Sequence, residues 1–199
     1  YERALRFAAG RPPAERAALL EAYAWETHLT DRLDASIAAR REAVELWRLE
    51  GKPERQGENL ARLSHTLIRA GRNAEAEEAS RASLDLLEPL PEGPERALAY
   101  RFQSYLRMLD RDLDDAVAWG ERAIEAAERF GDVDSLVHAY NSVGSSYLVG
   151  GQVERGRELL ERAVRRATEA GMDHHVADAF DNLGSAMGEV MRLDLAEEA

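Results

Sequence analysis

A repeat with a period of about 40 residues constrains the fold of this chain more than any other feature of its sequence. Corresponding segments begin at Asp31, Gly71, Arg111 and Gly151, and residues 193–196 match positions 33–36 as part of a fifth copy on the same spacing. Periods of roughly 20–50 residues are typical of solenoid arrays, in which each repeat buries its apolar face against its neighbours. The spacing therefore predicts a chain of stacked repeats.

Each repeat is predicted to be a pair of antiparallel helices. In the first half of a repeat, apolar residues such as Leu60, Leu63 and Leu67 recur at helical spacing, which places them on one stripe. Each half also carries one column of small residues, which permits two helix axes to approach closely. The two columns are Ala24, Ser64, Ser104, Gly144 and Gly184, and Ser36, Ala76, Ala116, Gly156 and Ala196.

The third repeat departs from this pattern. Gln103 and Arg107 occupy positions that are apolar in the other repeats. Two alternatives follow: either the apolar stripe is rotated toward Phe102 and Leu106, or this stretch is less well packed.

Proline, glycine and aspartate residues mark the ends of the predicted helices. The pattern predicts helices over residues 14–29, 33–49, 54–70, 73–87, 94–109, 113–129, 133–148, 152–169 and 174–190. Grouped in pairs, they give repeats at about 13–52, 53–92, 93–132, 133–172 and 173–199, preceded by the end of another repeat at 1–9. The predicted fold is all-α, a single array of about five such helical hairpins that forms a right-handed α-α superhelix.

The composition excludes several classes of protein. With 38 acidic and 26 basic residues the net charge is −12, which disfavours binding to nucleic acid or to an anionic membrane. The chain has no cysteine, so disulfides, thiolate zinc sites and a cysteine nucleophile are excluded. The sequence contains no run of about 18 apolar residues that would span a bilayer. We therefore expect a cytoplasmic location.

Both ends of the chain resemble interrupted helices. Residues 1–7 have the pattern of the second half of a helix, and residues 194–199 have that of the first half of another. We therefore expect the chain to be a fragment of a longer protein.

The segments 139–147 and 179–184 each place a small residue, Gly144 or Gly184, directly after an apolar one in the first helix of a repeat. Together with the alanines of the second helices, this pattern resembles the tetratricopeptide repeat (TPR) over nearly the whole chain. The usual period of that family is about 34 residues, so the longer period of this chain implies longer helices. The resemblance implies a scaffold that binds proteins or effectors.

The segments 1–10 and 113–123 resemble the TPR-like sensor region of large bacterial LuxR-type transcriptional regulators, which carry an amino-terminal nucleotide-binding module. This resemblance implies the signal-sensing part of a regulator. The ATP-binding and DNA-binding parts would lie outside this chain. Lys52, its only lysine, lacks the second glycine of a phosphate loop, and no basic helix-turn-helix stands out.

The first helix of each hairpin in such an array lines the concave side, where we predict a groove for a peptide or a small effector. Trp25, His65 and Tyr105 share one column on consecutive repeats and are predicted to form an aromatic ladder. Arg62 and Arg101 are candidates to pair with a carboxylate or phosphate. The full set of candidate groove residues is Glu21, Trp25, His28, Arg62, His65, Arg101, Phe102, Tyr105, His138, Asn141, Asp181 and Asn182.

A second interpretation of the same residues stays open. Trp25 and Tyr105 would then pack within the array, and the arginines would belong to solvated networks with glutamates. The paired Lys and Asn with which chaperone-binding members of the TPR family hold a terminal carboxylate are not reproduced here.

A metal site is suggested by Asp173, His174, His175 and Asp178, because His174 and Asp178 lie one helical turn apart. A third ligand is missing, and Asp173 is equally suited to cap a helix. No arrangement of a nucleophile beside a base can be proposed from the sequence. We therefore predict no metal, no cofactor and no enzymatic activity.

The sequence thus predicts a noncatalytic interaction module that senses a signal for a bacterial cytoplasmic regulator. Its partner would be a protein, a peptide or a small effector, and this chain would bind neither nucleic acid nor a membrane. The alternative is a structural spacer, or a module that associates with copies of itself through the ends of the array.

Overall fold

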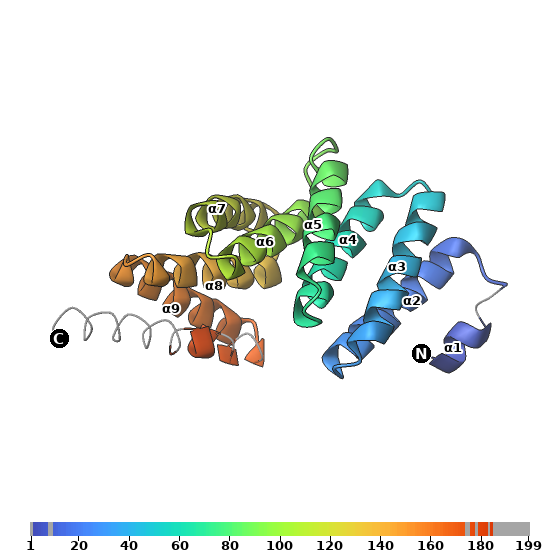
Figure 1. The fold of residues 1–199 in the computed structure, drawn as a ribbon, viewed down its shortest axis with the longest axis horizontal. Coiled ribbons are helices and arrows are strands. Elements are labelled where there is room, and N and C mark those ends of the chain that lie inside the picture. Colours follow the sequence, from blue (N-terminus) through green and yellow to red (C-terminus); the bar gives the residue numbers. More distant parts are fainter. Residues whose placement is uncertain (1, 8–9, 174–175, 178, 183, 185–199) are drawn as a thin grey trace. The chain divides into compact units, whose positions relative to one another are not determined.

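The computed structural model describes residues 2–7, 10–173, 176–177, 179–182 and 184, and its regular structure over these residues is helical (Figure 1). The elements are α1 (Glu2–Phe7), α2 (Pro13–Leu29), α3 (Leu33–Leu49), α4 (Pro53–Arg69), α5 (Asn73–Leu87), α6 (Pro94–Leu109), α7 (Leu113–Phe130), α8 (Val133–Val149) and α9 (Val153–Glu169).

The bounds of α2 to α9 agree closely with the predicted helices, and the ends that differ are displaced by a single position. The prediction succeeds because helix ends in this chain carry strong local signals. Proline occupies the first position of α4 and α6, for example, where its missing N–H costs nothing. Most of the predicted helix 174–190 lies outside the described residues.

The chain divides into two compact units, Tyr1–Phe102 and Gln103–Ala199, with the boundary inside α6. In the first unit, α2 packs on α3, α3 on α4 and α4 on α5, while α1 contacts α2. In the second unit, α7 packs on α8 and α8 on α9. Within each unit, helices adjacent in sequence are thus adjacent in space.

Most helix ends in the chain share the same backbone geometry. Left-handed φ angles occur at Asp31, Gly51, Gly71, Arg111, Gly131, Gly151 and Gly171. After each of them, the next N–H donates to the carbonyl five positions earlier, as from Arg32 to Thr27 at 2.8 Å and from Gln152 to Tyr147 at 2.8 Å. This is the bond of a Schellman motif, which satisfies a carbonyl left open at the helix end.

The series is interrupted at Pro91, between α5 and α6. Here a side chain replaces the backbone bond. Arg96 on α6 donates from Nε to the carbonyl of Leu87 at 3.1 Å, from Nη2 to that of Glu88 at 2.6 Å, and also to that of Leu90. The end of α5 is therefore capped by a guanidinium group.

The columns of small residues meet where the two helices of a hairpin approach most closely. Ser36 of α3 donates to the carbonyl of Ala24 in α2 at 2.7 Å. In the third hairpin the direction is reversed, because Ser104 of α6 donates to the carbonyl of Ala116 in α7 at 2.7 Å. The predicted close approach is confirmed.

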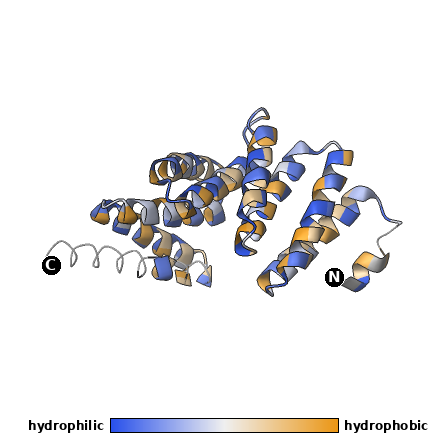
Figure 2. Cartoon of the chain, in the orientation of Figure 1, coloured by the Kyte–Doolittle hydropathy of each residue, from blue (hydrophilic) through white to orange (hydrophobic). Residues whose placement is uncertain are grey.

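The apolar faces of the helices form the core of each unit (Figure 2). Gly156, Leu160, Ala163 and Ala167 form the single buried stripe of α9, whereas α8 is buried around most of its circumference. In α6, Phe102 and Leu106 are buried, and so is Gln103, which argues against looser packing and shows that this helix is buried on more than one face. None of the helices in the described ranges combines the length and apolar character that crossing a membrane requires.

Candidate functional site

The first unit brings together seven of the predicted groove residues. Glu21, Trp25 and His28 lie on α2, Arg62 and His65 lie on α4, and Arg101 and Phe102 lie on α6. Helical spacing places the members of the first two groups on neighbouring turns of one face, whereas Arg101 and Phe102 are consecutive residues of α6. We call this surface, formed by α2, α4 and the part of α6 that belongs to the first unit, the ring face.

Four rings follow one another in a row across the ring face, with the first and the last neighbouring pairs stacked and the middle pair tilted by 43°. Trp25 and His28 are parallel within 11°, with their centroids 5.9 Å apart. The centroids of His28 and His65 are 5.1 Å apart, and those of His65 and Phe102 are 4.8 Å apart. Trp25 is 46% exposed whereas His28 and Phe102 are buried, so the indole of Trp25 is the accessible end of the row.

This ring row differs in composition from the predicted ladder of Trp25, His65 and Tyr105. Phe102 takes the place beside His65 because the stripe of α6 is rotated, and His28 stands between the rings of two repeats. Tyr105 belongs to the second unit. Arg101 is buried with its guanidinium carbon 4.6 Å from the centroid of the Phe102 ring, in cation–π contact.

Both histidines are held in the neutral form. Burial, followed by the charges of Arg69 and Arg40, lowers the pKa of His28 to about 4. Burial, followed by His28 and Arg101, lowers the pKa of His65 to about 3. The Nδ1 atom of His28 is 3.2 Å from the hydroxyl of Thr66. The ring row is therefore uncharged at neutral pH, although arginines surround it.

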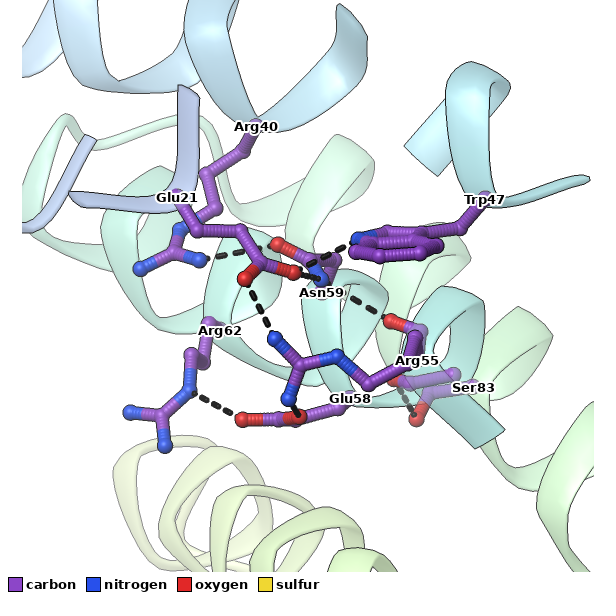
Figure 3. Close-up of polar contacts among 9 residues, drawn as sticks. Glu21, Arg40, Trp47, Arg55, Glu58, Asn59, Arg62 and Ser83 are labelled. Atoms are coloured by element: carbon purple, nitrogen blue, oxygen red, sulfur yellow. Dashed lines mark hydrogen bonds and ion pairs between the residues drawn. The ribbon is translucent and has the colours of Figure 1, made fainter. Parts of the chain in front are cut away.

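A network of polar side chains adjoins the ring row, and its centre is the carboxylate of Glu21 (Figure 3). The Trp47 indole donates to Glu21 at 2.6 Å and the Asn59 amide donates to it at 2.5 Å, while Arg55 forms an ion pair with it. Glu21 thus binds α2 to α3 and to α4. It was predicted to face a ligand, but its oxygens are occupied by these internal partners.

A second carboxylate extends this network along α4. Glu58 accepts a hydrogen bond from Nη1 of Arg55 at 2.6 Å and another from Nε of Arg62 at 3.1 Å. The two terminal nitrogens of Arg62 make no hydrogen bond within the described part of the chain, and Figure 3 shows them pointing away from Glu58. Arg62 thus retains donors for a further partner.

The third arginine of the network, Arg40 of α3, is only 5% exposed. Its Nη1 donates to the Asn59 carbonyl oxygen at 2.8 Å, and none of the described carboxylates forms an ion pair with it. Burial, followed by the charge of Arg62, lowers the pKa of Arg40 to about 10. A buried guanidinium whose direct partner is a neutral amide is unusual, because burying a charge is costly unless it is paired.

The remaining candidate residues lie in the second unit with Tyr105, and they differ in exposure. Asn141 of α8 is buried, His138 and Asn182 are partly exposed, and Asp181 is exposed. The Asn141 side-chain oxygen has no hydrogen-bond partner within the described ranges.

The second unit contains a pocket that the sequence did not suggest. It has a volume of about 450 Å³ and lies between the end of α7, the start of α8 and the last turns of α9. Tyr140 and Arg162 form one wall, joined by a hydrogen bond of 2.8 Å. The three basic residues of the lining, Arg162, Arg165 and Arg166, are balanced by three acidic ones, Glu128, Asp132 and Glu169. Acidic and basic groups are thus equal in number, and the lining favours neither sign of charge.

The metal hypothesis falls on His174, His175 and Asp178, which lie outside the described residues. Asp173 is described and is exposed. Across the described ranges, no group of three His, Asp or Glu side chains is placed to hold a metal ion.

Sequence reasoning missed Arg40 and Asn59, although the register of the repeat contains a signal for both. The positions that correspond to Arg40 in later repeats are Ser80, Gly120 and Leu160. Those that correspond to Asn59 are Leu19, Ala99, Ala139 and Ala179. A charged or amide side chain in a column of small or apolar residues marks a buried polar site.

No family model matches the chain, and no curated protein matches it. Solved structures do share its fold. The structure of BtubC (BKLC) from P. vanneervenii has a TM-score of 0.67 at 18% identity, with 86% of this chain and 72% of that chain covered. The kinesin light chain nearly identical TPR-like repeats from Podosopora anserina have a TM-score of 0.62 at 17% identity, with 95% and 98% covered.

A third similar structure is Rap protein complexed with Competence and Sporulation Factor, with a TM-score of 0.70 at 17% identity. The alignment covers 92% of this chain, which spans 57% of the Rap chain. At such low identity these similarities show the fold alone. The chain has an all-α, TPR-like repeat fold, as the sequence predicted.

Proposed function

We propose that this chain is a noncatalytic scaffold that binds a protein, a peptide or a small effector on the ring face of its first unit. The observation that carries the proposal is the ring row, which ends in Trp25 with 46% of its surface exposed. An exposed tryptophan backed by stacked rings offers a rigid apolar contact, and such residues dominate the affinity of many interfaces. Arg62 lies on the same face and retains hydrogen-bond donors.

The similarity to the Rap structure supports ligand binding, because that protein was solved complexed with a factor. We further propose that the chain is the signal-sensing region of a bacterial transcriptional regulator of the LuxR type, located in the cytoplasm. The resemblance of segments 1–10 and 113–123 to such sensors supports this context. The net charge of −12 supports a module that does not itself bind nucleic acid.

In the second unit, Tyr105, His138, Asn141, Asp181 and Asn182 are proposed as further ligand contacts. The partial or full exposure of His138, Asp181 and Asn182 supports this role.

Selection of peptides from a random display library against this chain tests the proposal. Selected peptides are expected to bind Trp25→Ala about 30-fold more weakly or worse, since a central tryptophan contributes about 2 kcal/mol or more. Leu49→Ala is the matched control, because Leu49 is exposed and apolar but lies on α3. Peptides that bind Trp25→Ala and the original chain equally well would refute the ring face as the ligand surface.

The competing function is a structural spacer or self-association module. Exposed apolar side chains on helices outside the ring row, such as Phe7 and Leu49, favour it. Light scattering distinguishes the two functions: a monomer at all concentrations excludes self-association, whereas a mass that grows with concentration and falls in Leu49→Ala supports it.

A further inference from the structure

We infer that Arg40 and Arg62 form a binding site for one carboxylate group of the ligand that occupies the ring face. This inference rests on the proposed function and specifies the chemistry of the partner. It follows from three properties of the polar network: its charge balance, the direction of its open donors and the depth of its burial.

The network contains one more cation than it contains anions. The guanidinium groups of Arg40, Arg55 and Arg62 lie with the carboxylates of Glu21 and Glu58. Arg55 pairs with both carboxylates, and Arg62 pairs with Glu58. The positive charge that remains resides at Arg40, whose direct partner is the neutral Asn59 amide. The neighbouring histidines add no charge, since they are neutral.

The open donors of the two arginines point in one direction. Figure 3 shows the second terminal nitrogen of Arg40 and both terminal nitrogens of Arg62 on the same side of the network, away from Glu21 and Glu58. The two groups are close enough that the charge of Arg62 disfavours protonation of Arg40. An anion between them would satisfy the open donors and remove this repulsion, because hydrogen bonds between ionised groups are the strongest available to a side chain.

The site is sheltered yet open on one side. Arg40 is 5% exposed, whereas the Arg62 side chain is 31% exposed. A ligand would therefore approach past Arg62 and meet Arg40 at the end of its path. Because Arg40 is shielded from water, its attraction for an anion is screened less than that of a surface arginine.

The single excess positive charge of the network favours a carboxylate over a phosphate as its ligand. One negative charge neutralises the excess at Arg40, whereas a phosphate dianion would leave the network with an excess of the opposite sign. The open nitrogens, two on Arg62 and one on Arg40, suit a group with two oxygens, each of which can accept from one arginine or from both. The partner is therefore a peptide or small effector with a free carboxylate, from an acidic side chain or a chain terminus.

Titration with sodium acetate against sodium chloride at equal ionic strength tests this site without knowledge of the natural ligand. The reporter is the indole N–H resonance of Trp47, which donates to Glu21 within the network, and that of Trp119 in the second unit is the internal reference. Acetate is expected to shift the Trp47 resonance in a saturable manner. Chloride is expected not to.

Two variants and one control assign the binding site. Arg40→Met and Arg62→Gln are each expected to weaken acetate binding about tenfold or more, since each removes a charge-assisted hydrogen bond. Arg81→Met should bind acetate normally, because Arg81 is an exposed partner of Glu77 on α5. A melting curve checks that Arg40→Met still folds, because this change also leaves the buried side-chain oxygen of Asn59 without its donor.

Three results would overturn the inference. The first is no saturable acetate shift in the original chain, and the second is undiminished binding in both Arg40→Met and Arg62→Gln. The third is tighter binding of inorganic phosphate than of acetate, which would refute the assignment to a carboxylate. The proposed function fails separately, because peptides that depend on Trp25 would still be selected if acetate did not bind.

Discussion

The hydroxyl of Ser36 on α3 donates to the backbone carbonyl of Ala24 on α2 at 2.7 Å, across the closest approach of the two helices. The corresponding pair in the third hairpin, Ser104 and Ala116, forms the same bond in the opposite direction. A residue no larger than serine is therefore required at both positions of each pair. This requirement holds the helices of a hairpin at a fixed spacing, and the register of the repeat preserves it.

Gly156→Ala is expected to destabilise the fold because it widens the fourth hairpin. A Cβ at Gly156 would lie 2.6 Å from the carbonyl oxygen of Gly144, a backbone atom that cannot rotate away. We expect a loss of about 1–3 kcal/mol in the free energy of unfolding. Chemical denaturation measures it. Gly10→Ala is the control, because no atom lies within 4 Å of a Cβ placed there, and an equal loss in both would refute the steric explanation.

Arg111→Gly is expected to stabilise the fold. Arg111 has a φ of 61°, in the left-handed region, at a position where Gly51, Gly71, Gly131, Gly151 and Gly171 stand at other helix ends. Relief of this conformation outweighs the backbone entropy that glycine loses on folding, by about 0.5–1 kcal/mol.

Thermal and denaturant unfolding measure this gain. The reverse change, Gly151→Ala, places a Cβ at a φ of 82° where no atom lies within 4 Å, so its cost reports backbone strain alone. A stabilising effect of Gly151→Ala would contradict the explanation.

Arg96→Ala tests the junction between α5 and α6, where Pro91 stands in place of the left-handed turn residue. The variant leaves the carbonyls of Leu87, Glu88 and Leu90 without their guanidinium donor. We expect a loss of about 1–3 kcal/mol in the free energy of unfolding, because a partly buried acceptor is left unsatisfied. Arg48→Ala removes an exposed arginine that pairs with Glu45 within α3, and it should change stability by no more than about 0.5 kcal/mol.

The sequence was sufficient to predict the helices because their signals are local and repeated. Turn residues, apolar spacing and small columns recur from one hairpin to the next, so each helix end is specified several times over. The ring row was predicted only in part. Whether Phe102 or Tyr105 faces His65 depends on how far α6 is rotated, and this rotation is set by packing against other helices rather than by the sequence of α6.

The polar network was missed because its members come from three helices and play different roles. Glu21 was expected to face a ligand, yet it accepts hydrogen bonds from Trp47 on α3 and Asn59 on α4. Arg40 lies on the second helix of its hairpin, whereas the groove was predicted on the first helices. Only comparison of each position with its counterparts in the other repeats would have identified Arg40 and Asn59 as exceptions.

Glu21→Ala is expected to cost about 1–3 kcal/mol, because the indole N–H of Trp47 loses its acceptor and Asn59 loses one of its two. The Glu21 side chain is 14% exposed, so solvent replaces the lost partner poorly. Glu15→Ala is the control, since Glu15 is exposed and pairs only with Arg11 on the described surface. Equal losses in the two variants, measured by urea unfolding, would show that the network contributes no special stability.

The two neighbouring histidines of the ring row, His28 and His65, should make the first unit sensitive to mild acid. Their pKa values in the folded protein, about 4 for His28 and about 3 for His65, lie below the ordinary value of 6.5. The unfolded chain therefore binds more protons than the folded chain when the pH falls below 6.5. Stability from these groups is complete above pH 6.5, and it is lost progressively as the pH falls toward 4 and 3.

Between pH 7 and pH 5 we expect the free energy of unfolding to fall by on the order of 1–2 kcal/mol for each histidine. At pH 5 most carboxylates are still ionised, so this loss separates from general acid denaturation. The double variant His28→Gln with His65→Gln cannot take up these protons and should lose much less stability over the same interval. Urea unfolding at both pH values makes the comparison, and His138→Gln controls for a partly exposed histidine of the second unit. If the double variant keeps the full pH dependence, then the destabilising protons are bound elsewhere, and the ring row is not the acid-sensitive element of the fold.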